Sequence, residues 1–442
     1  MSNVPLPANP FIYGRPARGA EFLGRQAELR TLFNRLRNGE STAVVGEPHI
    51  GKSSLLLQLA RPATLQQYLG ESAGQYLLVS WDLHNISHDY TPRQFWQEAL
   101  EPAAPLLAAV PRGPALLQRA ADTGYNRLAL EAVFNALGDE AGRRLVLLLD
   151  EFESLITHAN FKDAAFFAGL RSLSTRTSGL TLVTASRLSV AQMNERGRGL
   201  LDTGSPFFNN MIEVRLRPFD AGETEQLLGR AQPAFTLELR RFVRRVAGGH
   251  PFLQQALAAA LMEAGADLNG QAERAAESFY DRISYHFDDL WDSLDDRTRT
   301  AAVILCLLEL GGRALGERFA FGEIERVAAF GPELKKLAER GLAERADAGW
   351  QFDWDHLLLW QGERWTAGAQ AFVWWVRDVA IAETRPMAPY ADWLNDKRYR
   401  LLLTEQQWQT LRGAVSGLPA WAVHGVGGLA RALFDELLKR RP

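Results

Sequence analysis

Residues 46–54 constrain the fold of this chain more than any other segment. They read G-E-P-H-I-G-K-S-S, which fits the pattern G-x-x-x-x-G-K-S/T of a phosphate-binding loop. The apolar run 41–45 before the loop predicts a buried strand, and the leucine-rich run 54–59 after it predicts a helix. Such a strand–loop–helix unit suits an anion, because backbone N–H groups at a helix N-terminus point at the phosphate. The alternative is a chance match in a glycine-containing loop, which the flanking strand and helix disfavour.

The side chains of this loop predict a nucleotide site with a metal ion. Lys52 is expected to reach the β- and γ-phosphates, and Ser53 to ligate Mg²⁺ through its hydroxyl. The predicted cofactors are therefore ATP or ADP together with Mg²⁺. The residues that we expect around the phosphates are Gly46, Gly51, Lys52, Ser53 and Ser54.

A second acidic element follows about a hundred residues downstream. Residues 144–149 form a continuous apolar run, typical of a central parallel strand covered by helices on both faces, and the run ends in Asp150 and Glu151. Ligands of such sheets lie at the carboxyl ends of the strands. Asp150 is therefore predicted to complete the Mg²⁺ site, and Glu151 to orient or deprotonate the attacking water. Taken alone, the pattern would fit a buried strand capped by two solvated acids better than a metal site. Together with the phosphate loop, it favours the site.

Further strands and helices alternate along the first half of the chain. Strands are predicted at 76–82, 180–187 and 211–214, and helices at 93–107, 128–137 and 164–174. This alternation predicts an α/β fold with a doubly wound parallel sheet. Arg187 follows a strand end and could reach a γ-phosphate; the alternative is an ordinary surface arginine.

Composition sets the remaining bounds. A chain of 442 residues should hold two to four domains, and a formal net charge of −3 gives no general attraction to DNA or to anionic membranes. The single cysteine, Cys306, lies in an apolar run and is typical of a core residue in a reducing compartment. No apolar stretch reaches the length of a membrane span. We therefore expect a cytoplasmic protein that does not bind membranes.

The motifs together resemble the archaeal-type ATPases of the STAND class, signalling NTPases related to AAA+, NB-ARC and NACHT proteins. Residues 23–29 resemble the segment that lines the adenine pocket in that class, and they include Gly24 and Arg25. Residues 184–187 are similar to its sensor segment, and residues 248–253 to its lid motif, whose proline here is Pro251. The resemblance covers about residues 9–360. It implies that Gly24, Arg25 and Pro251 surround the base.

The resemblance also implies a domain organisation. We expect a P-loop nucleotide-binding domain at 1–219, a helical lid at 220–284, a winged-helix domain with a following helix at 285–384, and a helical C-terminal interaction module at 385–442. The wing is predicted at 341–354, with a turn at Asp347-Ala348-Gly349. The module could bind a protein effector or self-associate. The alternative for it is an extra helical layer on the winged helix.

Two classes of function stay open at this stage. The first is a nucleotide-dependent signalling switch that couples ATP or ADP to domain rearrangement and assembly, in bacterial defence or signal transduction. Glu47 adds an anion beside the phosphates, where the family commonly has small or basic residues, and it predicts slow hydrolysis. The second is a DNA-handling AAA+ ATPase of the initiator or loader kind. The helix at 332–340 carries glutamates as well as lysines, which favours an intramolecular brace over DNA reading.

Overall fold

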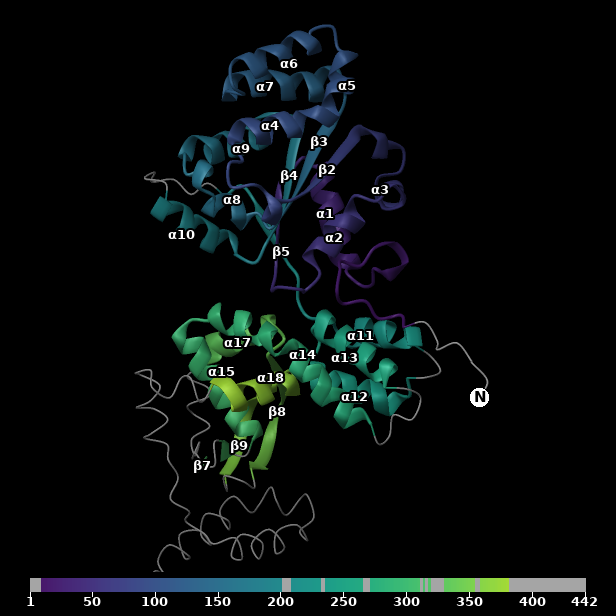
Figure 1. Cartoon of the computed structure of the whole chain (residues 1–442), viewed down its shortest axis with the longest axis vertical. Coiled ribbons are helices and arrows are strands. Elements are labelled where there is room, and N and C mark those ends of the chain that lie inside the picture. Colours follow the sequence, from purple (N-terminus) through teal and green to yellow (C-terminus); the bar gives the residue numbers. More distant parts are fainter. Residues whose placement is uncertain are drawn as a thin grey trace, which may run out of the picture. The chain divides into compact units, whose positions relative to one another are not determined.

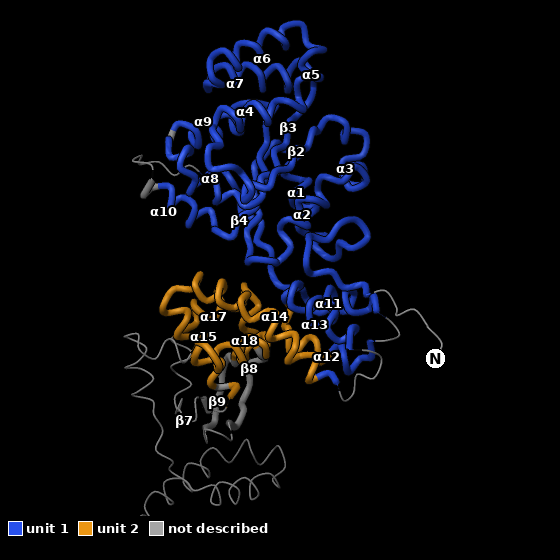
Figure 2. Tube along the Cα trace, viewed as in Figure 1, with its two compact units in different colours: residues 1–240, 250–272 blue, residues 241–249, 273–442 orange. Residues whose placement is uncertain are grey.

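The computed structural model describes residues 9–380 apart from 201–207, 232–234, 265–270, 311–312, 315–316, 319–329 and 354–357. The chain divides into two compact units, shown in Figure 2. Unit 1 comprises residues 1–240 and 250–272, and unit 2 comprises residues 241–249 and 273–442. The predicted C-terminal module at 385–442 lies outside the described residues. The four domain boundaries drawn from the sequence stay predictions.

Unit 1 is built on a five-stranded sheet whose strand order is β2-β3-β4-β1-β5, with every neighbouring pair parallel. The predicted α/β class and parallel sheet are confirmed. Because β4 lies between β1 and β3, the loops that follow these three strands meet at one edge of the sheet. The strands are β1 (Thr42–Val45), β2 (Tyr76–Asp82), β3 (Arg144–Asp150), β4 (Leu180–Ser186) and β5 (Ile212–Arg215).

Two apolar cores cover the faces of this sheet. In β3, Leu145, Leu147 and Leu149 face one core, while Val146 and Leu148 face the other. A strand buried on both sides has to be apolar throughout, which is why the continuous run in the sequence predicted it correctly. Helices α1–α3 pack in the core of one face, and helices α4, α7 and α9 in the core of the other (Figure 1).

Cap side chains accept backbone N–H groups at the starts of α4, α7 and α9; they belong to Thr91, Asn126 and Asp163. The first residue of α4 is a proline, which has no N–H that needs a partner. No helix among the described residues is both long and apolar enough to cross a bilayer. The α-helices are α1 (Gln26–Arg37), α2 (Lys52–Leu59), α3 (Pro62–Leu69), α4 (Pro92–Leu100), α5 (Ala104–Ala108), α6 (Gly113–Asp122), α7 (Arg127–Asn135), α8 (Glu153–Thr157), α9 (Ala164–Arg176) and α10 (Val190–Leu200). Single turns include η1 (Gly19–Glu21) and the π-helical η5 (Ala136–Glu140).

Helical segments follow β5, as predicted for the lid. They are α11 (Ala221–Leu228), η7 (Gly229–Ala231), α12 (Leu237–Ala247) and α13 (Pro251–Glu263). At the start of α11, Asp220 and Glu223 form a capping box, in which each side chain accepts the other residue's backbone N–H. Pro251 occupies the first turn of α13, where its missing N–H costs nothing.

Unit 2 holds helices and an antiparallel hairpin. Its elements are α14 (Ala272–Asp292), α15 (Asp296–Glu309), β6 (Arg313–Ala314), β7 (Glu317–Arg318), α17 (Gly331–Glu339), β8 (Ala343–Asp353), β9 (Leu358–Ala367), α18 (Gln370–Trp375) and the π-helical η8 (Val376–Ala380). The predicted turn at Asp347-Ala348-Gly349 is wrong. These residues lie inside β8, where the pairing with β9 shifts register between Ala346 and Gly349. A glycine within a strand marks such a bulge as readily as a turn. The winged-helix assignment itself stays a prediction.

Candidate nucleotide-binding site

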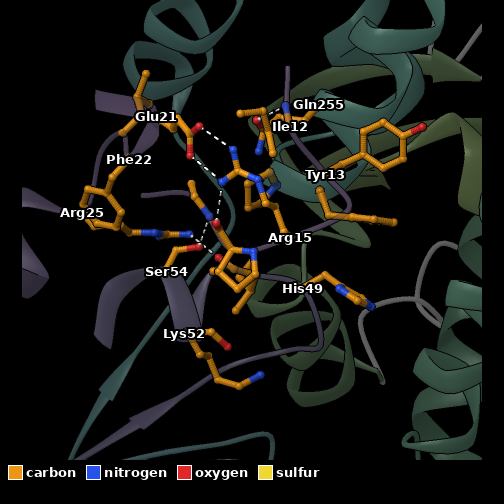
Figure 3. Close-up of a pocket in the computed structure, with 18 of the residues that line it drawn as sticks. Ile12, Tyr13, Arg15, Glu21, Phe22, Arg25, His49, Lys52, Ser54 and Gln255 are labelled. Carbon is orange, nitrogen blue, oxygen red and sulfur yellow. Dashed lines mark hydrogen bonds and ion pairs between the residues drawn. The ribbon is translucent and has the colours of Figure 1, made fainter. Parts of the chain in front are cut away.

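A cavity of about 410 Å³ lies in unit 1 at the carboxyl edge of the sheet. Its lining comes from the N-terminal segment, the loop before α1, the phosphate loop and the lid. Figure 3 shows the side chains of these segments turned toward one another. The lining residues are 12–17, 21–23, 25, 48–54, 151, 219, 227, 251, 252 and 255.

The phosphate loop has the backbone that its glycines predict. A Cβ at Gly46 would come within 2.8 Å of the Ile50 side chain, so no other residue fits there without a shift. Gly51 adopts a φ of 104° and caps α2, whose first residue is Lys52. The loop therefore ends on a helix N-terminus, as an anion site requires.

Lys52 is buried within this loop. Its Nζ donates hydrogen bonds to the carbonyl oxygens of Gly46 and Glu47, each at 3.0 Å. Burial lowers the pKa of Lys52, and the nearby carboxylates, led by Glu151 and Glu153, oppose that effect. Two carbonyl oxygens of the loop thus hold the ammonium, and the carboxylates around it act on its charge.

Ser53 and Asp150 are brought together across the sheet edge. Burial raises the pKa of Asp150, and the Ser53 hydroxyl, which is near enough to act on the carboxylate, opposes that rise. A hydroxyl and a carboxylate are hard oxygen ligands, and Mg²⁺ typically takes one or two such protein ligands together with substrate phosphates and water. The donor set at this point therefore fits Mg²⁺.

Glu151 adopts a strained backbone next to this pair. Its φ is 50°, in the left-handed region that non-glycine residues rarely enter. Arg25 and His49, which also line the cavity, have positive φ values of 61° and 59°. Strain of this kind, about 1–3 kcal/mol a residue, tends to gather at functional sites. Burial, followed by the charge of Glu153, raises the pKa of Glu151.

Arg187 lies at the end of β4 and is more than half exposed. Its Nε is 3.5 Å from the Oε1 atom of Glu153, and its backbone N–H donates to the same oxygen at 3.0 Å. Arg187 is near Glu151, whose pKa its charge lowers, but it does not line the cavity. Sequence reasoning missed Glu153, since only its burial distinguishes it from a solvated acid.

Gly24 and Arg25 join the loop before α1 to the lid and to the phosphate loop. The Arg25 N–H donates to Glu223 Oε1 of α11 at 3.0 Å, and its guanidinium donates to the carbonyl of Ile50 at 3.2 Å. The guanidinium also lies over the Phe219 ring, 4.9 Å from its centre. Arg25 lines the cavity, whereas Gly24 does not and instead leaves room for Glu223.

Pro251 lines the cavity from the lid, as expected, with Phe252 beside it. The Phe252 ring stacks on His49 of the phosphate loop, with ring centres 4.7 Å apart. Arg230 of η7 also joins the lid to η1, because its guanidinium donates to the carbonyl of Glu21 at 2.8 Å. A molecule in this cavity touches both the phosphate loop and the lid.

The N-terminal segment is the part of the wall that motif reasoning missed. The Ile12 N–H donates to Gln255 of α13 at 3.1 Å, and the Ala17 N–H donates to the Ser54 hydroxyl at 3.0 Å. The Arg15 guanidinium donates two hydrogen bonds to the Glu21 carboxylate, at 2.8 and 2.6 Å (Figure 3). The guanidinium lowers the pKa of Glu21 to about 2.

A phosphate loop after β1 of a five-stranded parallel sheet, with acids at the end of β3 on the far side of β4, defines a P-loop NTPase. More specifically, the chain belongs to the family described as Novel STAND NTPase 1, whose model matches residues 15–342. Membership of this family implies a bound nucleotide and, typically, Mg²⁺.

Several solved structures are similar to the chain. A Walker-type ATPase of Pyrococcus abyssi is 18% identical, with 82% of this chain and 99% of that chain covered and a TM-score of 0.47. A STAND protein with a tetratricopeptide repeat sensor from Pyrococcus horikoshii is 16% identical, with coverages of 85% and 44% and a TM-score of 0.34. Cdc6p from Pyrobaculum aerophilum is 13% identical, with coverages of 80% and 95% and a TM-score of 0.34. No functionally curated protein matches the chain.

Proposed function

We propose that this protein is a signalling switch in which ATP or ADP, bound with Mg²⁺, sets the position of the lid relative to the phosphate loop. One observation carries the proposal: the same cavity is lined by Lys52 of the phosphate loop and by Pro251 of the lid. A ligand that touches both segments favours whichever arrangement it binds better, and this differential affinity is what a switch requires.

The site residues receive the following roles in this proposal. Lys52 binds the β- and γ-phosphates, and Ser53 with Asp150 would hold Mg²⁺. The metal, when bound, neutralises charge on the phosphate oxygens. Glu151 orients the attacking water and takes its proton, and Arg187 binds the γ-phosphate. The base would lie between Arg25 and Pro251, which both line the cavity.

Slow turnover is part of the proposal. Glu47 places a carboxylate in the phosphate loop, and its charge acts on Lys52 together with those of three other acids. Negative charge so close to the γ-phosphate opposes the charge that builds up there during transfer. A slow hydrolysis rate gives the ATP-bound state a lifetime long enough for signalling. The output would be an effector or a second copy, engaged through residues 385–442.

Isothermal titration with ADP and with a slowly hydrolysed ATP analogue tests the proposal. The wild-type protein should bind both in the presence of Mg²⁺. Lys52→Ala should weaken binding by about a hundredfold or more, because a charged hydrogen bond to phosphate is lost from a buried position. Lys162→Ala is the matched control, since Lys162 is an exposed lysine of unit 1 that does not line the cavity. Unchanged nucleotide affinity in Lys52→Ala would contradict the proposed function.

A further inference from the structure

Glu153 is a buried carboxylate beside the candidate site for which the roles above give no use. It is the first residue of α8 and is 5% exposed. Its Oε1 atom accepts the N–H of Arg187, whereas its Oε2 atom has no hydrogen-bond partner among the described residues. Burying a carboxylate costs free energy unless charged or polar groups compensate it. A carboxylate buried at this position needs a cationic partner, and Glu153 forms an ion pair with Arg187.

The backbone around Arg187 is held from two sides. The carbonyl of Ser186 accepts the N–H of Gly46, the first residue of the phosphate loop, at 3.3 Å. On the other side, the N–H of Arg187 is fixed by Glu153 at 3.0 Å. The end of β4 thus links the phosphate loop to the turn after β3. A change at Glu153 is transmitted to Arg187 without passing through the nucleotide pocket.

The guanidinium of Arg187 is only partly engaged. Its Nε lies 3.5 Å from Oε1, and the side chain is 55% exposed. An arginine fork usually binds both oxygens of a carboxylate in parallel. Since Oε2 is not used here, donors of the guanidinium remain available for a second anion. The charge of Glu153 also acts on Lys52 and Glu151, so the carboxylate belongs to the electrostatic environment of the phosphates.

We propose that Glu153 is a positioning residue for Arg187, which it holds at the end of β4 so that the guanidinium can bind the γ-phosphate. The inference rests on the proposed function, because it takes a nucleotide in the cavity for granted. Glu153 itself touches no phosphate. Its removal leaves Arg187 in solvent, and the protein then loses its preference for the triphosphate while it keeps its affinity for the diphosphate.

Titration of wild-type protein, Glu153→Ala, Arg187→Ala and the double variant with ADP and with a slowly hydrolysed ATP analogue tests this inference. Each single variant should bind the analogue about tenfold more weakly, the loss of one charge-assisted hydrogen bond, with ADP affinity within about twofold of wild type. The double variant should bind the analogue no more weakly than either single variant. Such non-additivity is expected only when one residue acts through the other.

Glu153→Gln covers the possibility that Glu153→Ala fails to fold. The amide keeps an acceptor for the Arg187 N–H but loses the charge that attracts the guanidinium, so the analogue affinity should still fall. Glu333→Gln is the matched control, because Glu333 is another buried carboxylate with an ion pair, to Arg297 at 2.8 Å, and it lies in unit 2. It should leave the ratio of the two affinities unchanged.

The outcomes separate the two proposals. An unchanged ratio of ADP to analogue affinity in both Glu153 variants would overturn the inference alone, and so would losses that multiply in the double variant. Equal losses for ADP and analogue would show a merely structural role and overturn it as well. If the wild-type protein bound neither nucleotide, the proposed function would be wrong, and the inference would fall with it.

Discussion

At the scale of single residues, Glu151 is where backbone strain and proposed chemistry coincide. Its positive φ turns the chain directly after β3, so that Glu151 lines the cavity while Phe152 enters the core. A relaxed backbone at this position would not point the two side chains in these directions. The strain is thus a condition for having a carboxylate, next to Asp150, that lines the cavity.

We predict that Glu151→Gln preserves nucleotide binding and slows hydrolysis. The amide is the same size as the carboxylate but cannot accept a proton, so the rate should fall by about 10²–10⁴-fold, the usual contribution of a general base. Phosphate release under single-turnover conditions measures the rate, and titration measures the affinity. Glu131→Gln, on the exposed face of α7, serves as the control. Full turnover in Glu151→Gln would rule out the assigned role.

Some site residues could be predicted from the sequence, and others could not. The spacing within the phosphate loop and the acids after an apolar run identified Lys52 and Asp150, since these signals are local. The bond from Arg25 to the Ile50 carbonyl and the burial of Glu153 depend on chain segments that meet only in the folded state. Arg15 and Glu21 lie close in sequence, but nothing in their spacing shows that they border the cavity.

At the scale of elements, the start of α11 is fastened to the loop before α1. One oxygen of Glu223 accepts the N–H of Arg25 and the other accepts the N–H of Asp220. Gly24 makes this possible, because a Cβ there would lie 2.3 Å from the Glu223 Oε1 atom. The lid helix is therefore held by a carboxylate that fits only against glycine.

We predict that Gly24→Ala destabilises the protein more than a glycine substitution without this contact. The positive φ of 70° costs about 1 kcal/mol for alanine. Displacing Glu223 removes two hydrogen bonds of about 1 kcal/mol each, for a total of about 2–3 kcal/mol. Gly142→Ala is the control, since Gly142 has a φ of 62° but no atom near its missing Cβ. Thermal unfolding should show a fall in Tm about two to three times that of the control, and equal falls would contradict the argument.

The elements themselves were largely predictable. Continuous apolar runs identified the buried strands, and helices were expected from residue 220 onward. The position of the turn in the hairpin of unit 2 could not be predicted, because Asp347-Ala348-Gly349 has the composition of a turn but lies in a strand. Whether such a segment turns or bulges depends on the partner strand, and the partner begins only at Leu358.

At the scale of the whole molecule, the lid helices α11 and α13 belong to the same compact unit as the sheet, although sequence patterns separate lid and sheet at residue 220, whereas most of α12 belongs to unit 2. Composition does not reveal this grouping, because it depends on contacts between distant residues, such as Arg230 with the carbonyl of Glu21. Where the lid ends and the winged helix would begin stays a prediction for the same reason.

We predict that nucleotide state changes the mass of the particle in solution. Mass photometry should show the 49.2 kDa chain with ADP and a multiple of that mass with a slowly hydrolysed ATP analogue. The reason is that a signalling switch has to present a different surface in its two states. Lys52→Ala should show no nucleotide-driven shift. The same mass with ADP, with the analogue and without nucleotide would argue against self-assembly and leave a protein effector as the output.

The N-terminal segment bears on how fast a bound nucleotide would be released. Residues 12–17 form one wall of the cavity and are pinned at both ends, to α13 through Ile12 and to α2 through Ala17. In the proposed switch, a nucleotide bound against this wall would leave faster when residues 12–17 detach locally, a motion with its own free-energy cost and a timescale from microseconds to seconds. The residence time of ADP, more than the cleavage of ATP, would then determine how often the molecule resets.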